Sequence, residues 1–207
     1  LWTAGRLGAA VAAICATVLL ATLPADPTAT LRYSHDSAYI DRLVQNLLAG
    51  RGFVNDVLWY VFLMPPALPM PFHNANPGYP LAIAGISWLT GLQPASGGLV
   101  VSALAWASIV WAATCITARL FRLPALASVV VGLVVALYGP VFATGLHLLP
   151  DALCTAFLLW GSYCLLGRDR SSVAAAGALF GLAWLTRTSA VLVGPAVVLY
   201  LLCLLYT

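Results

Sequence analysis

Long apolar runs, separated by short polar breaks, make up most of this chain. A helix that crosses the hydrocarbon core of a membrane takes about 20 apolar residues, and four runs approach or reach that length: residues 7–23, 99–118, 124–143 and 150–166. A fifth apolar tract, residues 173–206, is interrupted by Arg187, so we expect two short spans that meet near this residue. The pattern predicts an all-α polytopic membrane protein with about six transmembrane helices.

The segment between the first two runs, residues 26–98, is the longest part that is not plainly a membrane span. Five of its apolar residues follow the i, i+3, i+4, i+7, i+8 spacing of one helix face: Ile40, Leu43, Val44, Leu47 and Leu48. Asp36 can cap the start of this helix, and Gly50 can end it. Because such a helix lies flat in the headgroup region, we predict a long external loop with amphipathic interfacial helices.

A shorter apolar segment, residues 79–92, decides the topology. At 1.5 Å per residue it reaches about 21 Å, less than a hydrocarbon core of about 30 Å. If it does not cross, the short loops on the cytoplasmic side hold five arginines, as the positive-inside rule requires: Arg6, Arg119, Arg122, Arg168 and Arg170. We therefore expect residues 79–92 to lie in the outer interface or to re-enter, with Asp36, Asp151 and Arg187 on the external face.

Composition supports the membrane assignment. Hydrophobic residues make up 62% of the 207 and charged residues 7%, whereas a soluble domain carries about 25% charged residues. A net charge of +3 gives no basic stripe, so we set nucleic acid aside as a partner. The five Cys all fall in apolar runs without a CxxC spacing and are interpreted as small buried hydrophobic residues.

Two features concern the ends and the packing of the spans. The chain begins at Leu1 and ends at Thr207 directly after an apolar run, so we expect part of a longer protein, truncated at the C-terminus. We interpret residues 7–23 as an uncleaved first span rather than a signal peptide. Gly177 and Gly181 form a GxxxG motif, which favours close helix packing.

Two aspartates are candidates for chemistry. Asp36 either stabilises the dipole of its helix or acts as a general base, with Tyr39 on the same helical face. Asp151 follows Pro150 in a favourable helix start, but ionisable groups at membrane depth are usually functional. His147 precedes Asp151 by one turn and can be its hydrogen-bond partner.

Other polar residues are candidates for substrate binding. Arg187 either snorkels to the interface or binds a phosphate with its two-pronged guanidinium. His73 and Asn76 precede a Pro-Gly turn, where they serve the turn or bind sugar hydroxyls or a metal, although one His and scattered Asp do not form a metal-ligand pattern. The sequence has no Gly-rich phosphate loop, GxSxG or HExxH motif, so we expect an activated donor to come from the membrane.

Five motifs follow one another in a recognisable order: Asp36 and Tyr39 with Gly50-Arg51-Gly52-Phe53, His73 with Pro77-Gly78-Tyr79-Pro80 and Gly91, Arg119-Leu120-Phe121-Arg122, Pro150-Asp151, and the helix Gly181-Leu182-Ala183-Trp184-Leu185-Thr186-Arg187. In this order the chain resembles the multi-spanning glycosyltransferases of the GT-C class, which include protein O-mannosyltransferases and the aminoarabinose transferase of lipid A. Asp36 is followed by Ser37 where many relatives carry a second acid.

The resemblance implies a polyprenyl-phosphate sugar donor, a glycan, lipid or protein acceptor, and inversion at the anomeric carbon by single displacement. It implies a hexosyl- or pentosyltransferase in a bacterial inner membrane with an outward-facing site. Asp36 would be the general base, and Asp151 would orient the acceptor or help Asp36 to hold a divalent cation, Mg²⁺ or Mn²⁺, although no firm metal site follows. The residues implied in substrate binding are Tyr39, His73, Asn76, Tyr79, His147 and Arg187.

Two alternatives belong to other classes. A transporter or flippase of lipid-linked sugars would place ionisable groups near mid-membrane on broken helices, whereas here they are expected at the outer face. A non-catalytic assembly subunit would need neither Asp36 nor Asp151. The sequence therefore favours a glycosyltransferase.

Overall fold

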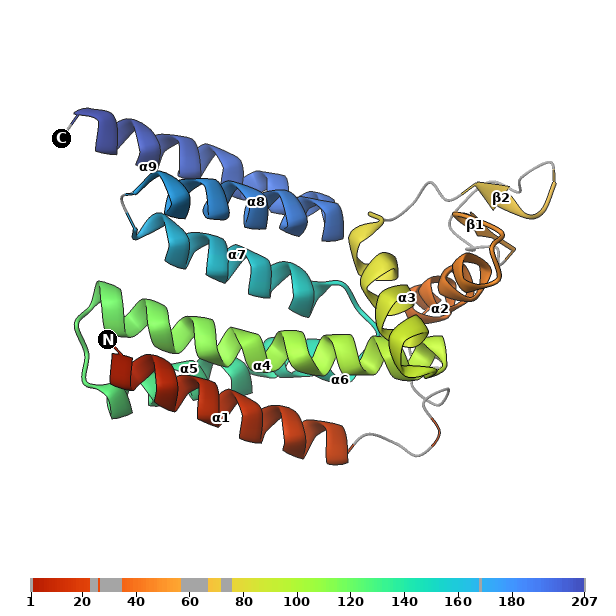
Figure 1. The fold of residues 1–207 in the computed structure, drawn as a ribbon, viewed down its shortest axis with the longest axis horizontal. Coiled ribbons are helices and arrows are strands. Elements are labelled where there is room, and N and C mark those ends of the chain that lie inside the picture. The colour runs from red at the N-terminus through yellow and green to blue at the C-terminus, as the bar shows by residue number, and fades with distance from the viewer. Residues whose placement is uncertain are drawn as a thin grey trace.

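The computed structural model describes residues 2–22, 26, 35–56, 67–71, 76–167 and 169–206. These form an elongated bundle of helices with a smaller group of elements at one end (Figure 1). The bundle comprises α1 (Trp2–Ala21), α4 (Pro94–Leu120), α5 (Ala125–Leu137), α6 (Gly139–Leu146), α7 (Asp151–Leu165), α8 (Arg170–Thr186), the short 3₁₀ helix η2 (Thr188–Val193) and α9 (Gly194–Tyr206). The smaller group comprises α2 (His35–Leu48), β1 (Val54–Asn55), β2 (Met70–Pro71) and α3 (Gly78–Thr90).

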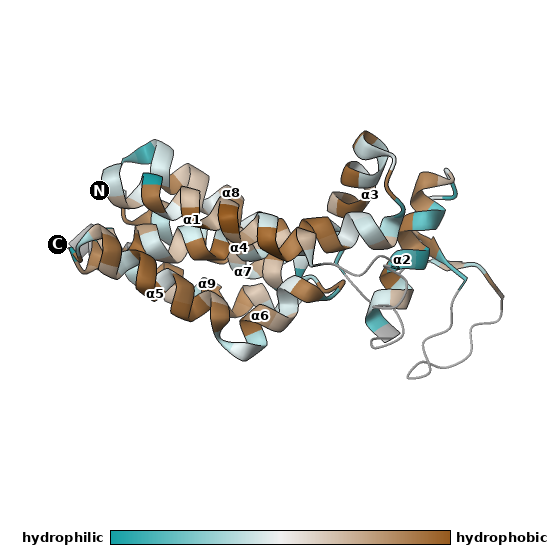
Figure 2. Ribbon diagram, turned by 90° about the horizontal axis from the view of Figure 1, so that it is seen from below, coloured by the Kyte–Doolittle hydropathy of each residue, from teal (hydrophilic) through white to brown (hydrophobic). Residues whose placement is uncertain are grey.

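Helix α4 is the centre of the bundle. In Figure 1, α7, α8 and α9 lie on one side of α4 and α1 lies on the other, and α4 contacts α1, α5, α6 and α7. The connections α4–α5 and α7–α8 lie at the end of the bundle that holds both chain ends. We call this the connection end and the opposite one, with α2 and α3, the α2 end. Helix α3 lies beside α2 at the α2 end and does not run along the bundle (Figures 1 and 2).

The helices show an all-α membrane protein, and hydrophobic residues make up most of the bundle (Figure 2). Among the described residues, α1 and α4 are long and apolar enough to cross a membrane, and α5 with α6 makes a third span if the two are counted together. This differs from the prediction of about six spans. The predicted span 124–143 is divided into α5 and α6, which are bent by 70°. The predicted span 150–166 is the 15-residue α7, and the tract 173–206 divides at Arg187 as expected.

Pro140 explains the bend between α5 and α6. A proline has no N–H and cannot donate to the carbonyl four residues earlier, so it breaks the helical ladder. That carbonyl belongs to Ala136, which is fully buried. Trp106 of α4 satisfies it, because its indole Nε1 donates to Ala136 O at 2.9 Å. A side chain of the central helix therefore replaces the hydrogen bond that Pro140 removes.

We expect Trp106→Phe to destabilise the protein by about 1–3 kcal/mol, the cost of a buried carbonyl without a donor. Phenylalanine keeps an aromatic ring against Phe142. In the structure Trp106 packs edge-on against Phe142, with 5.7 Å between the ring centroids. Chemical denaturation in detergent micelles would measure the change. Trp88→Phe on α3, where the side chain is 77% exposed, is the matched control. Equal stability of the two variants would contradict this role of Trp106.

Glycines let some helices approach closely, but not the pair expected. A Cβ at Gly132 of α5 would lie 2.7 Å from the Val110 carbonyl of α4, and a Cβ at Gly161 of α7 would lie 2.8 Å from the Phe180 ring of α8. A Cβ at Gly177 or Gly181 would meet no atom within 4 Å. The prediction that this GxxxG motif serves close packing is therefore wrong within the described structure. The close contact between α7 and α8 uses Gly161 of α7 instead.

The amphipathic helix predicted after the first span is α2. It ends at Leu48, and Gly50, two residues later, has the left-handed φ of +73° expected of a glycine that follows a helix. Its apolar face is covered by protein, however, since Ile40 and Val44 pack against Tyr79 and Ile83 of α3. The face expected to rest on the membrane interface therefore serves to hold α2 against α3.

Candidate functional site

An ion pair joins the start of α7 to the end of α8 at the α2 end of the bundle. Asp151 is the first residue of α7, and Arg187 follows the last residue of α8 in an extended conformation. Arg187 Nη1 donates to Asp151 Oδ1. The side chains are 46% and 33% exposed, so both remain accessible to a ligand. The two residues that the sequence placed 36 positions apart are thus in direct contact.

The segment that precedes α3 is hydrogen-bonded to the chain at the C-terminal end of α8, next to Arg187. Asn76 Nδ2 donates to the Trp184 carbonyl, and Thr188 Oγ1 donates to Asn76 Oδ1 at 2.8 Å. A Cβ at Gly78 would lie 2.7 Å from the Leu185 carbonyl, so this close approach requires glycine. Asn76 therefore bridges the chain on both sides of Arg187, and its amide is engaged with protein groups.

The start of α2 lies against the loop that leads into α7. Ser37 is fully buried, and its Oγ donates to the Leu148 carbonyl at 3.2 Å. Asp36, its neighbour in the first turn of α2, is half-buried. His147 belongs to the same loop, and its Nδ1 is buried without a hydrogen-bond partner among the described residues. Elements that carry Asp36, His147, Asp151 and Arg187 thus meet at the α2 end.

Two tyrosines expected in substrate binding are packing residues in this structure. Tyr39 is 2% exposed, and Tyr79 is 1% exposed. The Tyr79 hydroxyl lies 2.7 Å from Ser102 Oγ, which joins α3 to α4. A direct contact of either tyrosine with substrate stays a prediction. His73 lies outside the described residues.

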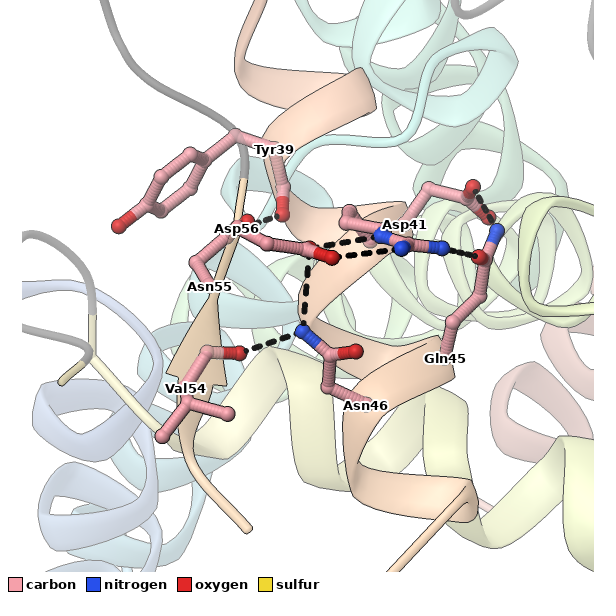
Figure 3. A network of polar contacts seen from close by, with 8 residues as sticks. Tyr39, Asp41, Gln45, Asn46, Val54, Asn55 and Asp56 are labelled. Atoms are coloured by element: carbon pink, nitrogen blue, oxygen red, sulfur yellow. Dashed lines mark hydrogen bonds and ion pairs between the residues drawn. The ribbon is translucent and has the colours of Figure 1, made fainter. Parts of the chain in front are cut away.

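A polar network that the sequence did not reveal holds α2 to β1 (Figure 3). Arg42 binds Asp56 with two hydrogen bonds, from Nε at 2.7 Å and from Nη2 at 2.6 Å. Asn46 Nδ2 donates to the Val54 carbonyl at 2.9 Å, and Asn55 Nδ2 donates to the Tyr39 carbonyl at 2.8 Å. The network joins α2 to β1 and to Asp56, the residue after β1. The polar face of α2 was a sequence signal for Arg42 and Asn46. Their hydrogen-bond partners, Val54 and Asp56, lie after the helix and had no such signal.

The network contains two carboxyl groups whose pKa values move in opposite directions. The Arg42 guanidinium holds the pKa of Asp56 well below its usual range. Burial raises the pKa of Asp41, which is 8% exposed, and hydrogen bonds from Gln45 and the Ala95 backbone oppose that rise. The hydrogen bond to Ala95 ties α2 to the first turn of α4.

We expect the protection of α2 and β1 from hydrogen exchange to fall only below about pH 4. The folded pKa of Asp56 is lower than the unfolded value of about 3.9, so its stabilising contribution is present above that value and disappears as pH falls through the folded pKa. The raised pKa of Asp41 has the opposite sign, because its protonation relieves a cost of burial. Hydrogen–deuterium exchange of residues 35–56 across this pH range would measure it. Asp56→Asn should abolish the fall, and an unchanged fall would assign it elsewhere.

A divalent cation held by Asp36 and Asp151 stays a prediction. In the described parts of the chain no three His, Cys, Asp or Glu side chains gather into a possible metal site. Asp151 binds Arg187 in this structure.

Comparison with known proteins gives one positive result. The model of the family described as dolichyl-phosphate-mannose-protein mannosyltransferase matches residues 73–205, more than half of the chain. No curated protein and no solved structure matches significantly. The matched range contains Asn76, Asp151 and Arg187, whereas Asp36 precedes it. The chain therefore belongs to the dolichyl-phosphate-mannose-protein mannosyltransferase family and is a membrane glycosyltransferase of the GT-C type.

Proposed function

We propose that the protein transfers a sugar from a polyprenyl-phosphate donor to an acceptor hydroxyl at the external face of a membrane, with inversion at the anomeric carbon. The observation that carries this proposal is the meeting of the Asp151–Arg187 pair with the start of α2 at one end of the bundle. Family membership supplies the reaction class, and the ion pair supplies a cation where a phosphate leaving group would need one.

The distribution of arginines supports an outward-facing site. Arg6 lies in the first turns of α1, Arg119 and Arg122 at the α4–α5 connection, and Arg170 at the start of α8. All of these segments belong to the connection end (Figure 1). The positive-inside rule assigns that end to the cytoplasm. The α2 end, with Asp151 and Arg187, then faces outward, as in a bacterial inner membrane.

The proposed chemistry needs a base and a cation. The acceptor oxygen forms a bond to the anomeric carbon while its proton passes to the Asp36 carboxylate, and the bond from that carbon to the phosphate oxygen breaks. The phosphate leaves as an anion, and Arg187 neutralises it. Arginine has five N–H donors, and Asp151 occupies Nη1, so the rest of the guanidinium serves the phosphate while Asp151 holds its orientation.

An apolar groove that reaches the first turn of α7 suits a lipid-linked donor. It has a volume of about 330 Å³ and lies between α3, α4, α7 and α8, and its lining includes Ile86, Leu104, Leu153, Phe157 and Leu179. Leu153 is only two residues from Asp151 in the first turn of α7. This groove would receive the isoprenoid chain of a donor whose phosphate lies at Arg187, in hydrocarbon-like surroundings that a soluble nucleotide sugar would not require.

A transfer assay in liposomes tests the proposal. We expect polyprenyl-phosphate sugar to give a glycosylated acceptor of inverted configuration, and Leu104→Trp to raise the apparent KM for this donor about tenfold by filling the groove. Leu104 is 47% exposed, so the change avoids the packed core. Val130→Trp on α5, where the side chain is 51% exposed, is the matched control. Movement of donor across the bilayer without a new glycosidic bond would favour a transporter instead.

A further inference from the structure

Two hollows flank the first turns of α1 at the connection end, far along the bundle from the proposed site. One has a volume of about 420 Å³ and lies between α1, α4 and α7, lined mainly by Trp2, Arg6, Trp111, Cys115, Trp160 and Tyr163. The other has a volume of about 610 Å³ and is lined by Thr3 and Ala4 together with Arg119, Arg122 and neighbouring residues of the α4–α5 connection. The first is thus mainly aromatic, and the second is cationic.

Arg119 links the two hollows. It lines the second, and its guanidinium lies 5.3 Å from the centre of the Tyr163 ring, which lines the first. Its Nη2 donates to the Leu166 carbonyl at 2.9 Å, which holds the side chain in this position. Arg6 stands at the rim of the first hollow, 5.5 Å from the Trp2 ring. A fixed guanidinium thus borders both the aromatic and the cationic surface.

The three arginines have no carboxylate partner in the described part of the chain. The ion pairs seen there are Arg42–Asp56 and Arg187–Asp151, both at the α2 end. Asp169, the acid of the α7–α8 connection, instead accepts hydrogen bonds from Ser171 and Ser172 as the cap of α8. Arg6, Arg119 and Arg122 therefore leave a concentrated positive charge beside an apolar hollow.

We propose that this place binds a phospholipid with an anionic headgroup. The phosphate would lie at this cationic surface, where Arg6 and Arg122 offer paired N–H donors, and an acyl chain would enter the aromatic hollow. Both hollows fall in the range of roughly 300–1,000 Å³ typical of ligand sites, and Trp and Tyr side chains are common where chains meet headgroups. The site would anchor α1 against α4 and α7, and it does not depend on the function proposed for the α2 end.

Two variants separate the chain-binding part from the headgroup-binding part. A Cβ at Gly5 would meet only Cys115 Sγ, at 4.0 Å, so Gly5→Leu fills the aromatic hollow without a clash of backbone. Gly177→Leu on α8, where a Cβ meets no atom within 4 Å, is its matched control. Arg6→Gln with Arg122→Gln removes charge but keeps Arg119 and its bond to Leu166. Arg170→Gln removes a charge at the same end but outside both hollows and is the second control.

Native mass spectrometry of the protein released from mixed nanodiscs of phosphatidylglycerol and phosphatidylcholine tests the proposal. The unmodified protein should retain phosphatidylglycerol about tenfold more than phosphatidylcholine, and both Gly5→Leu and the double arginine variant should lose about tenfold in this retention. The controls should bind as the unmodified protein does. The proposal would be overturned if the protein retained the two lipids equally, or if Gly5→Leu bound phosphatidylglycerol normally. It would also be overturned if Arg170→Gln lost as much binding as the double arginine variant, or if millimolar inorganic phosphate displaced all the bound lipid.

Discussion

Replacing Asp36 with asparagine should reduce sugar transfer by about 10²–10⁴-fold, the range expected for loss of a general base. Asparagine has nearly the same shape but cannot accept the acceptor hydroxyl proton. The start of α2 should stay in place, because the Ser37 contact to the Leu148 carbonyl and the Arg42–Asp56 pair do not involve Asp36. Initial rates with a polyprenyl-phosphate sugar in liposomes would measure the loss, and size-exclusion chromatography would check folding.

Asp56→Asn is the matched control for Asp36→Asn, since it removes a carboxylate from the same part of the chain. We call this part, residues 35–56, the α2 module. Asp56 binds Arg42 and Asn46, and we expect its loss to lower the stability of the module while transfer stays within a fewfold of normal. Near-normal transfer by Asp36→Asn would refute the role of base. A loss equal in both variants would mean that charge in the module, rather than proton transfer, supports activity.

The parts of the fold that sequence reasoning recovered depend on local chemistry. Gly50 follows the end of α2 because a left-handed residue favours glycine, and Arg187 divides the last apolar tract because a guanidinium is costly inside hydrocarbon. The bend at residue 138 was missed for an equally physical reason. Membrane helices tolerate proline when another group satisfies the freed carbonyl, and here that group, Trp106 Nε1, comes from 30 residues away.

The parts that sequence reasoning missed depend on partners distant in the chain. The spacing of α2 showed an apolar face but not that α3 would cover it. Gly177 and Gly181 share a motif, yet the sequence does not say which face of α8 meets α7. Asn76 was predicted to serve the turn or to bind sugar hydroxyls or a metal, and in the structure its amide bridges Trp184 and Thr188. Its polarity was a correct signal of a special position, although the contacts are within the protein.

Loss of the Arg187 guanidinium should have the second large effect on transfer. Removing one group that stabilises developing charge typically costs about 10²–10³-fold in rate, and we expect this loss for Arg187→Gln. Arg187→Lys keeps the charge but not the planar fork, so it should retain part of the activity. The rate of single-turnover transfer, with donor bound beforehand, would separate the bond-breaking step from donor binding.

Exchanging the two charges distinguishes a phosphate-binding arginine from a structural ion pair. In the double variant Asp151→Arg with Arg187→Asp, the pair between α7 and α8 can form again with its charges reversed. If Arg187 serves the leaving phosphate, the double variant should regain the thermal stability that Arg187→Asp alone loses. Its transfer should stay low, because the cation then lies on α7 and a carboxylate lies where the phosphate should bind. Each single variant, Asp151→Arg or Arg187→Asp, removes the pair seen in the structure. Recovery of both transfer and stability in the double variant would therefore show that the pair acts only to join the helices. The side chains of Arg187 and Asp151 are 46% and 33% exposed, so the changes in thermal midpoint should be small, because exposed ion pairs contribute little to stability, whereas the loss of transfer should be large.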